Sequence, residues 1–402
     1  MGEAGDPMPL DPTDPVELSR ALIRCPSVTP QEGGALTLLE SVLKPSGFEC
    51  HRLTMTEAGT PDVENLFARI GKGGGNGGPH LCFAGHTDVV PVGEESRWSQ
   101  PPFGAEIVDG QLYGRGAADM KGAVACFVAA ALDYLKVNSG LPRGTLSLLI
   151  TGDEEGVGIN GTVKVLKWMR ERGEVVDGCL VGEPTSGKLL GDEIKIGRRG
   201  YMNAEVTVHG KQGHSAYAHL ADNPIPKLAR ILDRIASTPM DMGTARFQPS
   251  SVQATLISVP NTATNVIPGA ARANFNIRYN DLHTRDSAEN WVRTQCAQAA
   301  AEVGAQFSLR FFGTGDVFLT EPGPLVDTMR EAVKAVTGRT TSLTTNGGTS
   351  DARFIYKYCP VIELGLVNDT VHQVDERVPV ADLLALTRIY HHFIESYFAT
   401  AA

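Results

Sequence analysis

The chain of 402 residues is longer than one hydrophobic core usually supports, so its length predicts two domains. It carries 36 basic and 46 acidic residues, a net charge of −10, with no run of five or more like charges, which argues against nucleic acid as a partner. No apolar stretch approaches the ~20 residues that span a bilayer, which argues against a membrane partner.

The N-terminus and the cysteines bear on the cell compartment. Residues 1–14 are acidic and rich in proline, so we expect a disordered extension and no signal peptide. The seven cysteines are scattered, odd in number and without a Cys-x-x-Cys pair. This usage is typical of reduced, mostly buried thiols in a cytoplasmic protein.

The first part of the chain alternates helices with extended runs. Apolar spacing predicts a helix after Pro15 that ends near Cys25, and a second helix over 34–43. Two extended runs follow, over 65–70 and 80–84, joined by the tract GKGGGNGG. Since the tract lacks the Lys-Ser/Thr and the following helix of a phosphate loop, we interpret it as a flexible hairpin connection.

The second extended run ends in the motif GHTDVVP. His86 and Asp88 lie two apart and so face the same way in a strand, where His86 can bind a metal while Asp88 accepts its other ring N–H. The alternative is a histidine that satisfies a local hydrogen bond at a strand end. GRGAADMKG comes next, ahead of a helix over 122–135, and Asp119 is either the N-cap of that helix or a bridge between two cations.

Acidic residues follow the next strands. The helix and an apolar run over 145–150 predict a parallel, right-handed strand-helix-strand unit. Glu154 and Glu155 follow in TGDEEG, and adjacent residues of an extended chain point to opposite sides, so one can bind a metal while the other acts as general base. Glu183 follows a short strand over 179–182. Ligands gather beyond the carboxyl ends of such strands, which favours one shared site over separate surface charges.

A different pattern starts at Tyr201. The elements run strand, helix, strand, strand, helix, strand over 204–210, 223–237, 252–259, 271–279, 287–303 and 306–312. This order predicts an inserted split-βαβ, ferredoxin-like domain. The first pattern then resumes, with helices expected over 324–336, 351–357 and 380–398 and a strand over 361–366. His372, in this last segment, is one more candidate ligand.

The expected architecture is therefore an α/β protein with two domains. Residues 15–199 and 314–402 would form a catalytic domain, with a mixed, largely parallel sheet and helices on both faces. Residues 200–313 would form the inserted dimerisation or lid domain.

Two histidines and three carboxylates match a dinuclear metal site: His86, Asp119, Glu155, Glu183 and His372. Asp119 would bridge two ions. His86 and Glu183 would complete one of them, and Glu155 and His372 the other. Imidazole ligands favour zinc over magnesium.

Seven motifs, in this order, resemble the co-catalytic zinc aminoacylase and carboxypeptidase family: GHTDVVP, GRGAADMKG, TGDEEG, VGEPT, GHSAYAHLADNP, NGGTSDARF and VHQVDERVP. The resemblance covers nearly the whole chain after about residue 14. It implies a homodimeric amide hydrolase with two Zn²⁺ per subunit, for which Co²⁺ can substitute. It makes Glu154 the base that deprotonates water and later protonates the leaving amine, and Asp88 the partner of His86. His214 would reach the partner subunit's site and stabilise an oxyanion.

The motifs match best a branch of this family whose small-molecule substrate carries several carboxylates, which arginine binds in a bidentate way. The resemblance assigns substrate contacts to Arg199, Arg278, Arg353, Asn265, Gly348 and Thr349. Tyr201 stands where this branch usually carries Ser, which leaves open a related acyl-amino-acid or peptide substrate. An inactive metal-dependent solute-binding protein is a further alternative, disfavoured by the presence of Glu154.

Overall fold

The protein forms two compact units in a computed structural model, which describes residues 10–71, 78–141 and 143–400. Unit 1 comprises the described residues up to Ile196, Thr320–Leu343 and those from Ser350 onward, and unit 2 comprises Gly197–Leu319 and Thr344–Thr349. The domain borders expected from the sequence lie close to these, but nothing in the sequence pointed to the short return of Thr344–Thr349 to unit 2. Most of the expected N-terminal extension lies outside the described residues.

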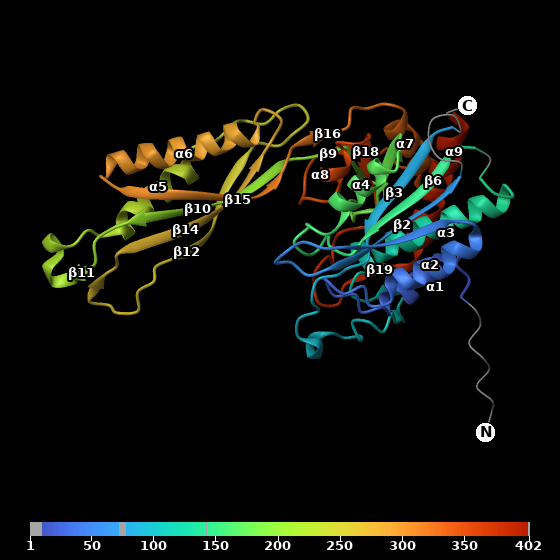
Figure 1. Cartoon of the computed structure of the whole chain (residues 1–402), viewed down its shortest axis with the longest axis horizontal. Helices are drawn as coiled ribbons and strands as arrows, with labels where there is room; N and C mark the ends of the chain where they lie inside the picture. Colours follow the sequence, from blue (N-terminus) through green and yellow to red (C-terminus); the bar gives the residue numbers. More distant parts are fainter. Residues whose placement is uncertain (1–9, 72–77, 142, 401–402) are drawn as a thin grey trace, which may run out of the picture. The chain divides into compact units, whose positions relative to one another are not determined.

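Unit 1 is built on an eight-stranded sheet with the order β1-β2-β6-β3-β7-β18-β8-β17 (Figure 1). Its strands are β1 (Glu49–Met55), β2 (Val63–Gly71), β3 (His80–His86), β6 (Thr145–Thr151), β7 (Gly178–Val181), β8 (Glu193–Lys195), β17 (Ser342–Thr344) and β18 (Val361–Glu363). The central strands β6, β3, β7 and β18 run parallel, whereas β1, β2 and β8 pair in antiparallel fashion. The predicted parallel unit is therefore confirmed.

The expected hairpin between the second and third strands is wrong. Strand β6 lies between β2 and β3 and pairs with both of them. Every residue of β6 is buried, and a strand that is apolar on both faces takes a central place in a sheet. Residues 72–77 of the glycine tract lie outside the described residues.

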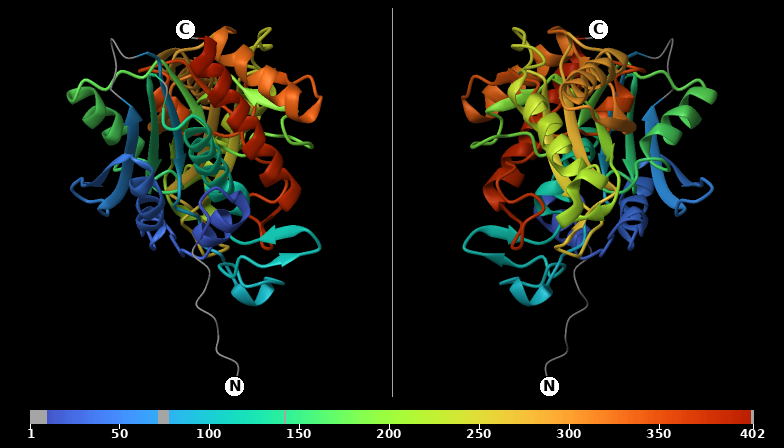
Figure 2. Two further views of the ribbon diagram at one scale, coloured as in Figure 1. Left: turned by 90° about the vertical axis from the view of Figure 1, so that its right-hand side faces the viewer. Right: turned by 90° about the vertical axis from the view of Figure 1, so that its left-hand side faces the viewer.

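Helices cover both faces of this sheet, as Figure 2 shows edge-on. They are α1 (Pro15–Ile23), α2 (Ala35–Leu43), α3 (Gly122–Val137), α4 (Thr162–Glu171), α7 (Pro324–Thr337), α8 (Ala352–Ile355) and α9 (Val380–Thr400). α3 packs against α1 and α9, whereas α4 packs against α8, β2 and β6. None of the helices within the described residues combines the length and apolar character that crossing a membrane requires.

The helix ends follow local sequence chemistry. The Asp14 side chain accepts hydrogen bonds from the N–H groups of Val16 and Glu17, and Pro15 stands at the first position of α1, where it loses no helical hydrogen bond. α3 is apolar on nearly all sides and is buried almost along its whole length, as expected for a helix inside a core.

Unit 2 contains the predicted split-βαβ arrangement. Its elements are β10 (Gly200–His209), α5 (Pro224–Ser237), β12 (Ser251–Ser258), β14 (Ala270–Tyr279), α6 (Arg285–Glu302) and β15 (Gln306–Gly315). The strands form an antiparallel sheet with the order β12-β14-β10-β15. Alternate residues of β10 and β14 are buried, in a core that includes side chains of α5 and α6. Period-2 burial is the signature of a sheet covered on one face.

Smaller sheets complete the chain. β4 (Ile107–Val108), β5 (Gln111–Tyr113) and β19 (Arg377–Pro379) form one in unit 1; in unit 2, β9 (Gly197–Arg198) pairs with β16 (Phe318–Leu319), and β11 (Gly213–His214) with β13 (Val266–Ile267). β11 lies at one end of the unit 2 strands and β9 at the other (Figure 1).

An aromatic cluster joins the sheet of unit 1 to its buried helices and generates a stability prediction. The rings of Phe83 and Phe127 stack with centroids 4.3 Å apart, and Tyr390 of α9 contacts both rings. We expect Phe127→Ala to lower the free energy of unfolding by about 3–5 kcal/mol, since it removes a buried ring and leaves a cavity. Val137→Ala is the control on the same helix, because Val137 is 69% exposed. Urea unfolding followed by circular dichroism measures both; equal small losses would contradict the assigned core.

Candidate metal centre

The first histidine of the site is fixed at the end of β3. His86 is 1% exposed, its Nδ1 lies 2.9 Å from the backbone carbonyl oxygen of Asp88, and its Nε2 lies 3.1 Å from Asp119 Oδ1. A ring that donates from Nδ1 to a carbonyl keeps the lone pair of Nε2 for a metal. The expected contact with the Asp88 side chain differs in detail: the carboxylate is 3.7 Å from Nδ1 and instead accepts the backbone N–H groups of Glu154 and Glu155.

Asp119 lies between two imidazoles. Its Oδ1 faces His86 Nε2 at 3.1 Å, and its Oδ2 faces His372 Nε2 at 3.4 Å. The residue belongs to the irregular turn Ala117–Lys121 that precedes α3, and the alternative N-cap role is wrong, because Lys121 holds that position and no side chain caps the helix. A carboxylate whose two oxygens face two different histidines has the arrangement that a bridging ligand requires.

The side chains of the two adjacent glutamates have different neighbours in the site, although not for the reason expected. They lie in a turn after β6, so the alternation of an extended chain does not apply. Glu155 Oε1 is 2.7 Å from His372 Nε2. Ligand atoms of Glu154, His86 and Glu183 lie within 4.8 Å of one another, as do those of His86, Asp119 and Glu155. Proximity alone therefore fits Glu154 to a ligand role as well as to that of a base.

The site holds an excess of negative charge. Burial raises the pKa of Asp88 to about 6 and that of Glu154 to about 8, and it raises the pKa of Glu183 well above its usual range, with the charges of Glu154 and Asp119 adding to the effect. Hydrogen bonds to Asp119 and Glu155 raise the pKa of His372 to about 10. Carboxylates crowded in this way favour bound cations, so the donor set fits two divalent metal ions.

The predicted substrate residues of unit 2 fall into two groups. At one end of the sheet, Arg278 lies opposite Tyr201, and the neighbouring charges of Arg199 and Arg198 act on it: burial, then these charges, lower its pKa. Arg198 donates to the carbonyl oxygen of Gly348 at 2.9 Å, which brings the loop with Thr349 to this end of the sheet.

The second group lies at the other end of the same sheet. His214 pairs with Val266 in the β11–β13 bridge, and the N–H of Ser215 donates to the carbonyl oxygen of Asn265 at 2.9 Å. The His214 ring is exposed and lies beside Tyr217, with ring centroids 5.7 Å apart. About 26 Å, eight residues of β10 at ~3.3 Å each, separate the two groups.

The sequence analysis assigned no role to three buried residues of unit 1, which are Asp351, Arg115 and Glu376. Asp351 lies close enough to Glu154 for its charge to raise the pKa of that carboxylate. Arg353, predicted to bind substrate, is buried with Nη2 3.7 Å from Asp351 Oδ1. Arg115 and Glu376 form an ion pair of 2.7 Å near the centre. Both lie inside quoted motifs, GRGAADMKG and VHQVDERVP. Arg115 stands between two glycines, which was an available signal, whereas Glu376 stands between the charged residues Asp375 and Arg377 and carried none.

The sequence model of peptidase family M20/M25/M40 matches residues 82–396. The chain belongs to this family. A succinyl-diaminopimelate desuccinylase from Bradyrhizobium sp. is 54% identical over 387 residues, covering 96% of this chain and 100% of that protein. One from Rhodospirillum centenum is 56% identical over 388 residues, covering 96% and 98%. These relatives confirm the family that the motifs indicated.

Solved structures of M20/M25/M40 peptidases share the fold. A tripeptidase from Staphylococcus aureus superimposes with a TM-score of 0.77 at 18% identity, covering 97% of this chain and 99% of that chain. A Bacillus subtilis protein described as a dinuclear metal binding peptidase of the M20 family gives a TM-score of 0.72 at 19% identity, covering 97% and 99%. The α/β fold predicted from the sequence is thus that of known members of the family.

The second prediction compares Glu154 with Glu155, of which Glu155 contacts His372. Glu154→Gln should leave the bound metal at the wild-type level while hydrolysis falls ~100 to 10,000-fold, since a general base is lost. Glu155→Gln is the matched control and should lower the metal content, because it alters a predicted ligand that faces His372. Metal is counted by plasma mass spectrometry after gel filtration. Loss of metal from Glu154→Gln, or a rate above a tenth of wild type, would contradict the role of base.

Proposed function

We propose that the protein is a succinyl-diaminopimelate desuccinylase. It would hydrolyse N-succinyl-LL-2,6-diaminopimelate to succinate and LL-2,6-diaminopimelate, a step of lysine and diaminopimelate biosynthesis. Two observations support this: relatives of that name are 54% and 56% identical over 96% of the chain, and Asp119 faces two histidines in the manner of a bridging ligand. The position of Asp119 supports hydrolysis as the reaction class, because pairs of metal ions bridged in this way catalyse hydrolysis.

The donor set supports two zinc ions per chain, with cobalt as an expected substitute. His86, Asp119 and Glu183 would hold one ion, and Asp119, Glu155 and His372 the other. When bound, the ions supply Lewis acidity and a template for the reacting groups.

The proton transfers fall to Glu154. Its carboxylate would take a proton from the attacking water and return it to the leaving amine. Burial raises the pKa of this carboxylate, which makes it a stronger base toward the attacking water. The Asp88 carboxylate accepts the N–H groups of Glu154 and Glu155 at 3.3 and 3.0 Å and so fixes the turn that carries the base.

A cluster of guanidinium groups supports a substrate with several carboxylates. Arg278 lies above the ring of Tyr201 at 5.2 Å, its Nε donates to Asn276, and the charges of Arg199 and Arg198 act on it. Like charges gathered at the end of a sheet repel one another, and an anionic ligand relieves this repulsion. Arg278 and Arg199 are therefore the proposed contacts of the succinyl carboxylate and its neighbours.

The test of the function combines a substrate panel with one variant. Metal-free protein loaded with zinc or cobalt should prefer the N-succinyl substrate to N-acetyl analogues and peptides. Arg278→Ala should lower kcat/KM for the N-succinyl substrate about 10- to 150-fold more than for the N-acetyl analogue, because only the former offers the distal carboxylate to a charge-assisted contact.

Arg272→Ala is the matched control. Arg272 is exposed on the same strand and faces the same way as Arg278, about 20 Å further along. It should leave both substrates unchanged. A wild-type preference for N-acetyl or peptide substrates would overturn the function, whereas equal losses on both substrates for Arg278→Ala would overturn only the arginine assignment.

The position of His214 supports a role at another subunit's site. About 26 Å of sheet separates His214 from Arg278 within unit 2, which is more than one small substrate spans. His214 and Arg278 of the same chain therefore do not contact the same substrate molecule. We propose that His214 and Asn265 serve the site of the partner in a homodimer, where His214 would stabilise the oxyanion.

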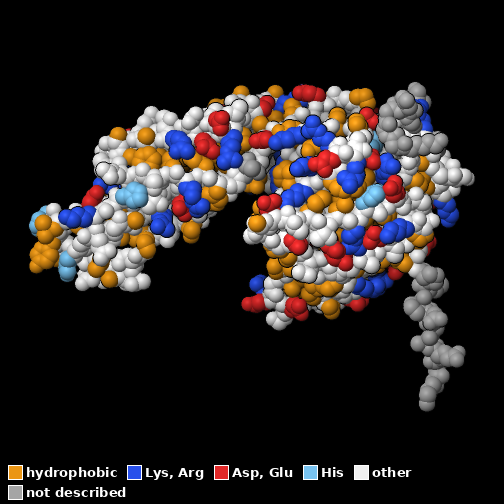
Figure 3. All heavy atoms as spheres, viewed as in Figure 1, with side chains coloured by type: hydrophobic (Ala, Val, Ile, Leu, Met, Phe, Trp, Pro, Cys, Tyr) orange, Lys and Arg blue, Asp and Glu red, His pale blue; other side chains and the backbone are white. Residues whose placement is uncertain are grey.

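Exposed apolar groups on unit 2 support such a dimer. β12 is an edge strand on which Leu256 and Ile257 are 55% and 60% exposed, and an apolar edge is a pairing surface. At the end that carries β11, Figure 3 shows hydrophobic and histidine side chains at the surface, and Tyr217 and Leu220 are exposed there. A cytoplasmic location stays a prediction, supported by the seven free cysteines.

Subunit mixing tests the trans role of His214. His214→Ala and Glu154→Gln are each inactive in this proposal. If His214 acts in trans, each mixed dimer has one site with both lesions and one with neither, so activity returns to about a quarter of wild type after random exchange. Exchange is verified with differently tagged subunits. A mixture that stays inactive after verified exchange would place His214 in its own subunit's site.

A further inference from the structure

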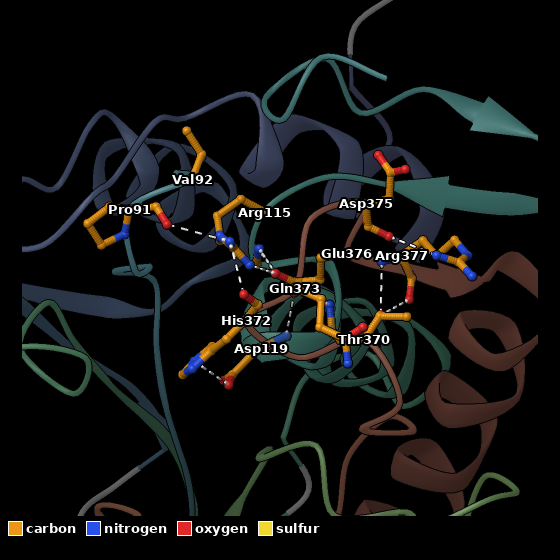
Figure 4. Close-up of polar contacts among 12 residues, drawn as sticks. Pro91, Val92, Arg115, Asp119, Thr370, His372, Gln373, Asp375, Glu376 and Arg377 are labelled. Atoms are coloured by element: carbon orange, nitrogen blue, oxygen red, sulfur yellow. Dashed lines mark hydrogen bonds and ion pairs between the residues drawn. The ribbon is translucent and has the colours of Figure 1, made fainter. Parts of the chain in front are cut away.

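A buried ion pair next to the metal centre takes no part in the proposed reaction. Arg115 is 2% exposed and Glu376 is 0% exposed, and Arg115 Nη1 lies 2.7 Å from Glu376 Oε2. Figure 4 shows the pair between the turn that bears Asp119 and the loop that bears His372. A buried ion pair adds little stability over an apolar pair of similar volume, so a different physical role is needed to explain these contacts.

Glu376 holds the backbone of the turn that carries Asp119. Its Oε1 accepts the N–H groups of Ala118 and Asp119 at 2.9 and 3.1 Å, and its Oε2 accepts that of Gly116 at 3.1 Å. Its own carbonyl oxygen accepts the N–H of Gly114 at 2.9 Å. The turn has non-helical φ and ψ angles at Asp119 and Met120, and one carboxylate accepts three of its backbone N–H groups.

Arg115 reaches two other segments of the site. Its Nη2 lies 3.5 Å from the carbonyl oxygen of His372 and 3.5 Å from that of Pro91, in the segment that follows His86. The guanidinium also lies over the ring of Trp98, 5.3 Å from its centroid. One side chain thus contacts the His372 loop, the segment after β3 and, through Glu376, the Asp119 turn.

The loop of His372 needs such support. His372 and Asp375 adopt φ angles of 61° and 60°, a left-handed conformation that is strained for a residue other than glycine and persists only where the surroundings impose it. Asp375 Oδ1 accepts the N–H of Ser99 at 2.7 Å. Thr370 Oγ1 donates to the carbonyl oxygen of Arg377 at 2.9 Å, as Figure 4 shows. These contacts close the loop, and the contact of Arg115 joins it to the Asp119 turn.

We propose that Arg115 and Glu376 form a positioning clamp that presets the Asp119 carboxylate and the His372 imidazole for metal binding. The clamp acts through the backbone of both ligands and touches neither substrate nor metal. It rests on the dinuclear site of the proposed function, because Asp119 and His372 are its ligands there. Its loss therefore weakens metal binding before it affects any later step.

Two variants separate positioning from general stability. Glu376→Gln keeps the side-chain volume but replaces one accepting oxygen by a donating amide nitrogen. The side chain can then no longer accept hydrogen bonds from both Arg115 and the backbone of the turn through two oxygens. The substitution also leaves the buried charge of Arg115 without its carboxylate partner, which destabilises the fold. The double variant Arg115→Met/Glu376→Gln removes that charge and keeps the test valid if the single variant does not fold.

Glu174→Gln is the matched control. Glu174 also forms a 2.7 Å ion pair, with Arg69, within unit 1, and neither residue is among the proposed metal ligands. Chelator-treated proteins are dialysed against a series of Zn²⁺ concentrations and the bound metal is counted. Circular dichroism verifies folding, and the visible spectrum of the Co²⁺ forms reports on ligand geometry.

Wild type and Glu174→Gln should bind two ions per chain with the same Kd values. The folded clamp variants should bind the weaker ion 10- to 100-fold less tightly, the usual effect of losing a residue that orients metal ligands, and should show an altered Co²⁺ spectrum. Excess zinc should restore part of their hydrolytic rate. A folded double variant with wild-type Kd values, or a control that loses as much affinity, would overturn the clamp. A wild type that binds fewer than two ions would overturn the dinuclear site and the clamp with it.

Discussion

Five carboxylates and two imidazoles gather at the edge of the mixed sheet where its parallel strands end, and the rest of unit 1 depends on this constraint. β3, β6 and β7 each end at this edge, and each is followed by an acidic or histidine side chain of the site. Burial raises the pKa values of Asp88, Glu154 and Glu183 and so opposes the charge of these carboxylates. The arrangement is stable because imidazoles, backbone N–H groups and bound cations each stabilise the negative charge of these carboxylates.

The same physical device appears twice around this edge. The Asp88 carboxylate accepts two successive backbone N–H groups of the turn after β6, and the Glu376 carboxylate accepts three from the turn before α3. Turns that present a ligand cannot satisfy their own backbone through regular structure. A buried carboxylate that accepts several such groups fixes the turn and gains hydrogen bonds for its own charge.

Much of this arrangement was predictable from the sequence, and the exceptions have physical reasons. Continuous apolar runs and short motifs identified the central strands and the residues that follow them, because both are local in the chain. The place of β6 between β2 and β3 was not predictable, since strand order depends on how faces pack and not on sequence neighbours. The pairing of Arg115 with Glu376 joins residues 261 positions apart and carries no periodic signal.

All the proposed metal ligands belong to unit 1, whereas the arginine cluster and His214 belong to unit 2. The proposed metal ligands and the arginines proposed to contact the acyl chain thus lie in separate compact units. Substitutions that retune the acyl preference can accumulate in the antiparallel sheet of unit 2 without disturbing the charge balance around Asp119. A new substrate specificity can then evolve without compensating substitutions at the metal centre. This architecture is therefore well suited to diversification by small steps.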